Sequence, residues 1–248
     1  MTLSDLRNNE GVFPSIKTLR EYDRLVRAGF GRASQFYAGQ QILIPRLDDF
    51  RNAHTAIFAE VSGEAGQIRD EDCLVQIFGS MLDDCDMEEE FHLLGKQLSQ
   101  MVTKAKNIQD CVVIVAFTHG RIVAAQPALF GNKRTAMCLA LSQIRALFPI
   151  ITTLNPFSIN AYYEALGKTV DGCSDQLNVV FGQILGVPGP FNPAPFSARC
   201  GAAVSEMNNL SCTLAVRKAL CTPRSLASNR GPGQESGSRS RYRDLHRA

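Results

Sequence analysis

The chain has no tryptophan and only four histidines among its 248 residues. It also lacks the short motifs that bind phosphates, dinucleotides or a catalytic zinc ion, and the GxSxG turn of a serine nucleophile. We therefore predict no cofactor, no metal site and no catalytic residue, and we identify no small-molecule substrate. The chain is expected not to be an enzyme, although an enzyme without a recognisable signature stays as an alternative.

Long apolar runs are missing as well. No uninterrupted run approaches the 18 residues that a membrane-spanning helix needs, and the first residues lack the basic-then-apolar pattern of an export signal. The chain has eight cysteines, but no two of them have the CxxC spacing of zinc and redox sites. These features predict buried free thiols in a reducing compartment, a cytoplasmic protein and no membrane partner.

Charged residues are distributed unevenly, although the net charge is only +2. Residues 1–46 have 7 Lys and Arg against 4 Asp and Glu, residues 47–110 have 5 against 14, and residues 111–248 have 14 against 6. A chain that is basic, then acidic, then basic can bind a polyanion at its ends, or bind copies of itself through opposite charges.

Most of the chain has the periodicity of amphipathic helices, so we predict a mainly α fold. Ser15 is a suitable N-cap and Gly29 a suitable stop for the first helix, and Glu88, Glu89 and Glu90 favour the start of another. The predicted helices cover residues 16–28, 46–61, 69–82, 86–106, 132–148, 156–167, 173–185 and 209–221.

One stretch has a different pattern. Residues 111–117 form a continuous apolar run rich in β-branched residues, and a second apolar run at 122–125 follows His119 and Gly120. Such a run fits either a β-hairpin or one buried helix, because periodicity does not distinguish them. The sequence favours a short hairpin near 111–125.

The predicted organisation has two helical lobes and a tail. The N-terminal lobe covers residues 1–110 and the C-terminal lobe covers 111–221, where four prolines exclude regular structure from 186–196. Phe191 and Phe196 in that loop could pack on this subunit or on a neighbouring one. Residues 222–248 are rich in Ser, Gly and Arg, have a net charge of +4 and predict a disordered basic tail.

Basic side chains give the main functional hypothesis. Lys17, Arg20, Arg24 and Arg27 recur at steps of three and four, so they share one side of the predicted helix, and Arg32 follows. Such a stripe can bind the phosphates of a nucleic acid. A solvated helix surface, with Glu21 and Asp23 compensating the charge, is the equally weighted alternative.

Two further basic clusters extend the candidate set. Lys133 and Arg134 lie at the start of a predicted helix and Arg145 near its end, so the first two oppose the helix dipole and indicate an external anion. Pairing with the acidic middle segment explains them equally well. The tail has Tyr242 beside three arginines, Arg239, Arg241 and Arg243. This combination fits non-specific RNA attachment, and a solubilising terminus is the alternative.

Two other constellations are interpreted structurally. The acidic cluster at 83–90 lacks the spacing of a calcium loop, so we interpret it as an acidic helix N-terminus or as a docking surface for a basic tail. Cys111 with Asp110 and His119 could form a cysteine-nucleophile scheme, but Cys111 opens an apolar run and is interpreted as a buried thiol.

Residues 110–121, with the sequence DCVVIVAFTHGR, resemble a stretch in nucleocapsid proteins of phlebovirus-type segmented negative-strand RNA viruses. Residues 139–149 are similar to a later helix of the same family. The resemblance implies a mostly helical, two-lobed protein that grips single-stranded RNA in a basic cleft and self-assembles. By position, it implies RNA contacts at Arg121 and Arg145.

A second resemblance involves residues 12–50, where the segments 18–22, 29–30, 36–37 and 42–45 are similar to a MerR-type winged-helix DNA-binding module. It implies a transcriptional regulator that places the 16–28 helix near the DNA major groove. The leading prediction is instead a nucleocapsid or coat-like protein that encapsidates single-stranded RNA non-specifically and forms homo-oligomers. Such a protein would be found in the host cytoplasm and the virion if it is viral.

Overall fold

Helices form nearly all of the secondary structure that the structure describes, which confirms the mainly α fold. The structure, a computed structural model, describes residues 2–69, 75–77, 80–82, 86–149, 153–170 and 175–191. Within them, the helices are α1 (Leu3–Glu10), α2 (Leu19–Gln40), α3 (Leu47–Phe58), α4 (Met87–Lys104), α5 (Ile108–Ala125), α6 (Asn132–Leu147), α7 (Ile159–Val170) and α8 (Asp175–Leu185). Two short strands, β1 (Val75–Ile77) and β2 (Ser80–Leu82), pair antiparallel.

The hairpin predicted near 111–125 is wrong, because α5 covers this segment as one helix. Asn107 and Asp110 form a capping box at its start: the Asp110 amide donates to the Asn107 side chain at 2.8 Å, and Asp110 accepts from the Asn107 amide. A helix that is buried on nearly all sides needs apolar residues on every face, so it produces the same continuous pattern as a buried strand.

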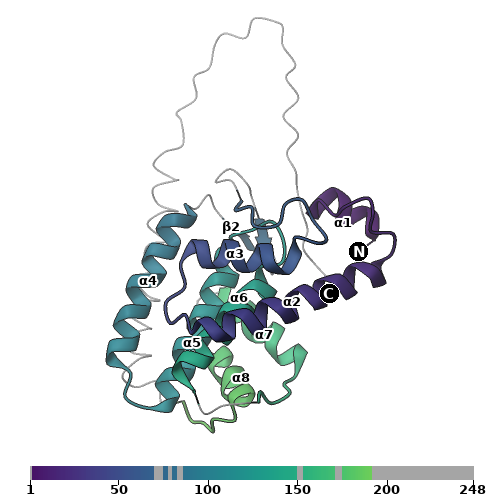
Figure 1. The fold of residues 1–248 in the computed structure, drawn as a ribbon. Coiled ribbons are helices and arrows are strands. Elements are labelled where there is room, and N and C mark those ends of the chain that lie inside the picture. The colour runs from purple at the N-terminus through teal and green to yellow at the C-terminus, as the bar shows by residue number, and fades with distance from the viewer. Residues whose placement is uncertain are drawn as a thin grey trace, which may run out of the picture. The chain divides into compact units, whose positions relative to one another are not determined.

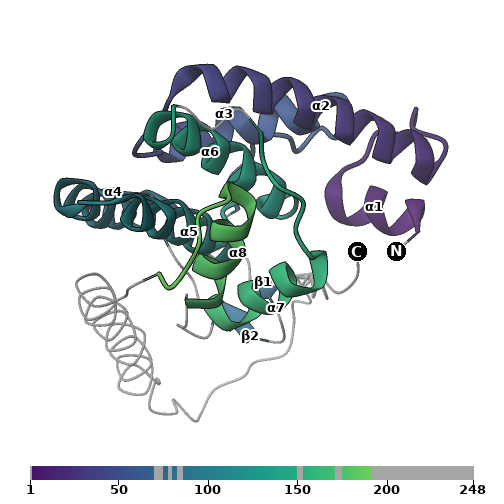
Figure 2. The same ribbon diagram turned by 90° about the horizontal axis from the view of Figure 1, so that it is seen from below.

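Four of the described helices surround α5. It packs against α4, α6, α7 and α8, and Figures 1 and 2 show it between α4 and the α7–α8 pair. Gly120 allows the closest approach, since an added Cβ would lie 2.7 Å from Thr169 of α7 and 3.0 Å from Leu177 of α8. By length and composition α5 would also suit a membrane span, but most of it is buried inside the fold.

A second group of helices lies over α6. Helices α2 and α3 are antiparallel neighbours, and both contact α6 (Figure 1). Gly29, the predicted stop, lies in the middle of α2, which continues to Gln40. An added Cβ at Gly29 would lie only 2.2 Å from the backbone oxygen of Ile57, so this glycine allows the close approach of α2 to α3.

The N-terminal residues are fixed to this group. The Phe13 amide donates to the Val61 carbonyl at 2.9 Å, beside an isolated bridge between Val12 and Ser62. The Tyr22 hydroxyl donates to the buried carboxylate of Glu10 at 2.7 Å. These bonds hold α1 and the following loop against α2 and the end of α3.

Several other predictions differ from the structure. The helix predicted over 69–82 is wrong, because the described part of this segment contains β1 and β2. Helix α1, which Thr2 caps, was not predicted. A lobe boundary between residues 110 and 111 falls inside α5, so the division into lobes stays a prediction, and the predicted helix at 209–221 and the tail at 222–248 lie outside the described residues.

Phe191, one of the two phenylalanines in the loop after α8, packs on its own subunit. Phe191 lies against α8 so closely that an added Cβ at Gly182 would come within 1.9 Å of its ring. Phe196 lies outside the described residues.

We expect Gly29→Ala to destabilise the protein by about 1–3 kcal/mol or more, because the new methyl group meets the α3 backbone, which cannot move aside cheaply. Gly31→Ala is the matched control on the same helix. An added Cβ at Gly31 meets no atom within 4 Å, so alanine should raise stability by about 0.5–1 kcal/mol through helix propensity. Urea unfolding of both variants measures the difference, and equal effects would contradict the packing role of Gly29.

Candidate nucleic-acid interface

Helix α2 carries most of the predicted basic stripe. Thr18 caps it by accepting from the Glu21 amide at 3.0 Å, and the Glu21 carboxylate accepts from the Lys17 amide at 2.9 Å. Five residues at steps of three and four form its buried face: Tyr22, Val26, Gly29, Ala33 and Tyr37. This burial fixes which side of α2 faces outward.

Arg20, Arg24 and Arg27 lie on the side opposite the buried face. At 100° per residue they fall within an arc of about 60°, and all three side chains are exposed. Within the described residues, none of the three forms an ion pair. We call these three arginines the basic face of α2. The predicted compensation by Glu21 and Asp23 does not take the form of ion pairs with these arginines.

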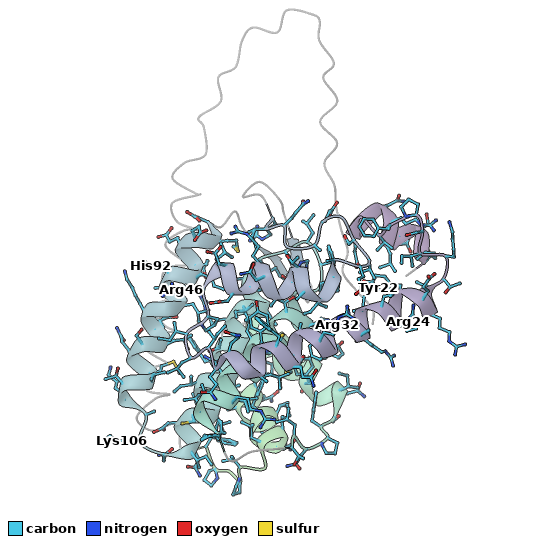
Figure 3. The ribbon with its side chains drawn as sticks, viewed as in Figure 1. Tyr22, Arg24, Arg32, Arg46, His92 and Lys106 are labelled. Carbon is cyan, nitrogen blue, oxygen red and sulfur yellow. The ribbon has the colours of Figure 1, made fainter. Side chains whose placement is uncertain are left out.

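The other two members of the predicted stripe have partners. Lys17 precedes the helix and donates from Nζ to the Pro14 carbonyl at 2.8 Å, although its side chain is exposed. Arg32 forms an ion pair with Glu60, and both side chains are more than half exposed. Figure 3 labels Tyr22, Arg24 and Arg32 along α2. It also labels His92 on α4 and Lys106, two residues after the end of that helix.

Lys133 and Arg134 lie in the first turn of α6, which has no acidic residue and no side-chain cap. Lys133 Nζ lies 4.5 Å from the centre of the Tyr163 ring, and burial, followed by the charge of Arg134, lowers its pKa. Burial is the main cause that raises the pKa of the Tyr22 hydroxyl, and the charge of Glu10 is the second cause. The positive charge of Arg134 lowers this pKa.

The two arginines implied by the nucleocapsid resemblance lie on the central helices. Arg121 of α5 forms an ion pair with Glu90 of α4 at 2.8 Å, and the side chains are 18% and 28% exposed. This pairing compensates its charge inside the protein. Arg145 is half-buried in the last turn of α6, where the helix dipole favours a cation.

The remaining tail arginines, Arg239, Arg241 and Arg243, lie outside the described residues. So do two members of the acidic cluster, Asp83 and Asp84. Of the others, Asp86 caps α4 by accepting from the Glu88 and Glu89 amides, as expected for an acidic helix N-terminus. Across the described ranges, no three His, Cys, Asp or Glu side chains are grouped as a metal site.

The cysteine-nucleophile scheme does not form in this structure. Cys111 and His119 lie eight residues apart on α5, and Asp110 is used in the capping box. Burial, and next the charge of Asp110, raise the pKa of the Cys111 thiol, so the reactive thiolate is disfavoured. His119 is fully buried, and its Nε2 lies 2.8 Å from the Tyr162 hydroxyl. Cys111 is half-buried, so the prediction of a buried thiol is met only in part at this position, whereas Cys138 is buried as predicted.

No family model matches the chain, and no curated protein matches it either. These two comparisons give no support to the nucleocapsid or the MerR resemblance, which both stay predictions.

Sequence reasoning missed several buried polar residues that organise the fold. Arg69 is buried and donates from Nε to the Gln126 carbonyl at 2.8 Å, which caps the end of α5. His54 is buried among Phe50, Phe58 and Phe130. No local motif marks these residues, because the hydrogen-bond partners that hold them, Gln126 for Arg69 and Gly66 and Phe130 for His54, lie more than ten residues away in the sequence.

His54 is neutral in the fold. Its Nδ1 accepts from the Gly66 amide at 2.8 Å, so the proton is on Nε2, which donates to the Phe130 carbonyl at 3.0 Å. Burial lowers the pKa of His54 from 6.5 to about 4, although the bond to Phe130 acts in the opposite direction. Burial likewise lowers the pKa of His119 to about 4.

We expect acid to destabilise the protein through these histidines. Between pH 6.5 and 4 the unfolded chain binds protons that the folded chain does not, so the free energy of unfolding falls as pH falls. His54 alone accounts for a decrease of about 3 kcal/mol over this range. His54→Gln should lose stability at pH 7 but show a weaker decrease on acidification. Urea unfolding from pH 7 to 4 measures this. An unchanged pH dependence in His54→Gln would contradict the role of His54.

Proposed function

We propose that this protein binds single-stranded RNA without regard to sequence, through the basic face of α2, and self-assembles as a nucleocapsid or coat-like protein. The observation that carries the proposal is the position of Arg20, Arg24 and Arg27. They are exposed, lie on one side of the helix and have no acidic partner within the described residues.

The electrostatic argument is direct. Three guanidinium groups within an arc of about 60°, with no ion pair to any described residue, repel one another. A line of phosphates would remove this repulsion and release counterions. The helix has 22 residues and is about 33 Å long, so it can follow several nucleotides of one strand.

Self-assembly has a separate support. The segment before α7 and the first residue of this helix expose three large apolar side chains, Leu154, Phe157 and Ile159. Exposed apolar side chains close together mark surfaces for other protein chains. Encapsidation requires such contacts between copies as well as a phosphate-binding face.

Arg20→Ala, Arg24→Ala and Arg27→Ala, combined in one variant, should weaken binding of a labelled oligouridine by about 10- to 100-fold near 0.1 M salt. The slope of log affinity against log salt should fall by about 2, since each phosphate contact on a single strand contributes about 0.7. Fluorescence anisotropy at several salt concentrations measures both. Alanine preserves the helix, because it has the highest helix propensity.

The matched control removes the same charge elsewhere. Lys96, Lys104 and Lys106 are also exposed, and they lie on α4 and just after it. Their combined replacement by alanine should leave the salt slope nearly unchanged. Equal losses in the two variants would remove the basic face from the site and indicate attraction by overall charge only.

The DNA-binding alternative involves the same exposed helix, which would then enter a major groove. Competition with duplex DNA distinguishes the two functions. The proposed function requires that an unlabelled single strand compete better than a duplex of the same length, and preference for one duplex sequence would support the regulator instead.

A further inference from the structure

Exposed side chains at intervals of four residues wind around α2 from Arg20 to an aromatic ring, turning by about 40° at each step. Arg20, Arg24, Ala28, Arg32 and Phe36 follow one another at intervals of four residues, and all five are exposed. Residues four apart are surface neighbours, with Cβ atoms about 5–6 Å apart, and such a row forms a ridge inclined to the helix axis. We call these five residues the α2 ridge.

Phe36 is the end of this ridge. Its side chain is 60% exposed, more than any other large apolar side chain in the described part of the chain. One contact orients the ring, an edge-on arrangement with Tyr37 at 5.3 Å between centres. A single exposed phenylalanine requires no explanation by itself. This ring is the surface neighbour of Arg32 and ends a row that holds three arginines, and aromatic rings beside cationic side chains bind single strands of nucleic acid.

The surface beside the ring is open. Gly39 lies one turn beyond Phe36 and Gly31 lies between Arg27 and Gln35, and an added Cβ at either glycine would meet no atom within 4 Å. Glycine destabilises a helix relative to alanine, so packing does not account for either position. Gly31 points to another side of the helix, but without a side chain at 39 a planar group can approach the helix next to the ring.

We propose that Phe36 stacks on a base of the single-stranded RNA whose phosphates bind Arg20, Arg24 and Arg32. This inference rests on the proposed function and explains how the site would select single-stranded over double-stranded nucleic acid. Phosphate contacts do not distinguish RNA from any other polyanion, whereas a stacked ring requires an unpaired base. Stacking accepts every base, so the site remains independent of sequence.

Arg32 becomes available to a phosphate if its ion pair with Glu60 opens. Both partners are more than half exposed, and such pairs are weak because water screens them. Glu60→Gln should therefore tighten RNA binding and raise the salt slope by about 0.7. Glu88→Gln on α4 changes the net charge equally at an exposed position and should leave the slope unchanged. If the two variants behave alike, Arg32 is not part of the site.

The absence of tryptophan allows a direct test of stacking. Phe36→Trp places the one indole of the chain at the end of the ridge, and Val179→Trp places it at an exposed position on α8 as a control. Oligouridine should quench the emission of Phe36→Trp in parallel with binding and leave Val179→Trp unchanged. Inorganic polyphosphate, which has no bases, should bind without quenching. Quenching by polyphosphate, or RNA binding without quenching, would overturn the proposal.

Phe36→Ala tests the energy of the same contact. It should weaken oligouridine binding by roughly tenfold with an unchanged salt slope and unchanged polyphosphate binding. If the triple arginine variant loses RNA binding and Phe36→Ala does not, stacking is wrong and the proposed function stands. If wild-type protein binds no RNA, both fail. A further outcome would also overturn the proposal. If the emission of Phe36→Trp changes with protein concentration in the absence of RNA, a second copy of the protein covers the ring instead.

Discussion

Burial of α5 is the constraint on which the rest of the fold depends. This helix has apolar residues on all sides, so it needs neighbours on all sides, and α4, α6, α7 and α8 supply them. Its polar ends are compensated by Asn107 and Asp110 at the start and by Arg69 at the end. Helix α6 packs against α5, and α2 packs against α6 in turn. The outward side of α2 is therefore free for arginines.

The same arrangement distinguishes the arginines by function. Arg121 extends from the central helix and pairs with Glu90, so its charge stabilises the contact between α5 and α4. Arg20, Arg24 and Arg27 are on α2, which packs on α3 and α6; they are exposed and form no ion pair with any described residue. A guanidinium group that is paired inside the fold holds helices together, whereas one that is exposed and unpaired is available for a ligand.

Much of the fold could be predicted from the sequence, because most helices have a clear apolar face. Helix α4, for example, was predicted over 86–106 and covers Met87–Lys104. Two predictions failed where local pattern and tertiary packing differ. A fully buried helix was interpreted as a hairpin at 111–125, and Gly29 was interpreted as a stop although it provides the contact between α2 and α3. The candidate site was partly foreseen, since the arginine spacing predicted a shared face. The exposure of Phe36 and the pairing of Arg32 with Glu60 depend on neighbours that only the fold brings together.

The central claim is that this protein binds RNA, and size-exclusion chromatography with light scattering tests it most directly. With no tryptophan and five tyrosines the protein absorbs weakly at 280 nm, so bound nucleic acid dominates the absorbance ratio. Freshly purified protein should elute as a large assembly with high absorbance at 260 nm, and nuclease should reduce both the mass and that absorbance. A monomer or dimer with low absorbance at 260 nm, which does not change after single-stranded RNA is added, would contradict the account.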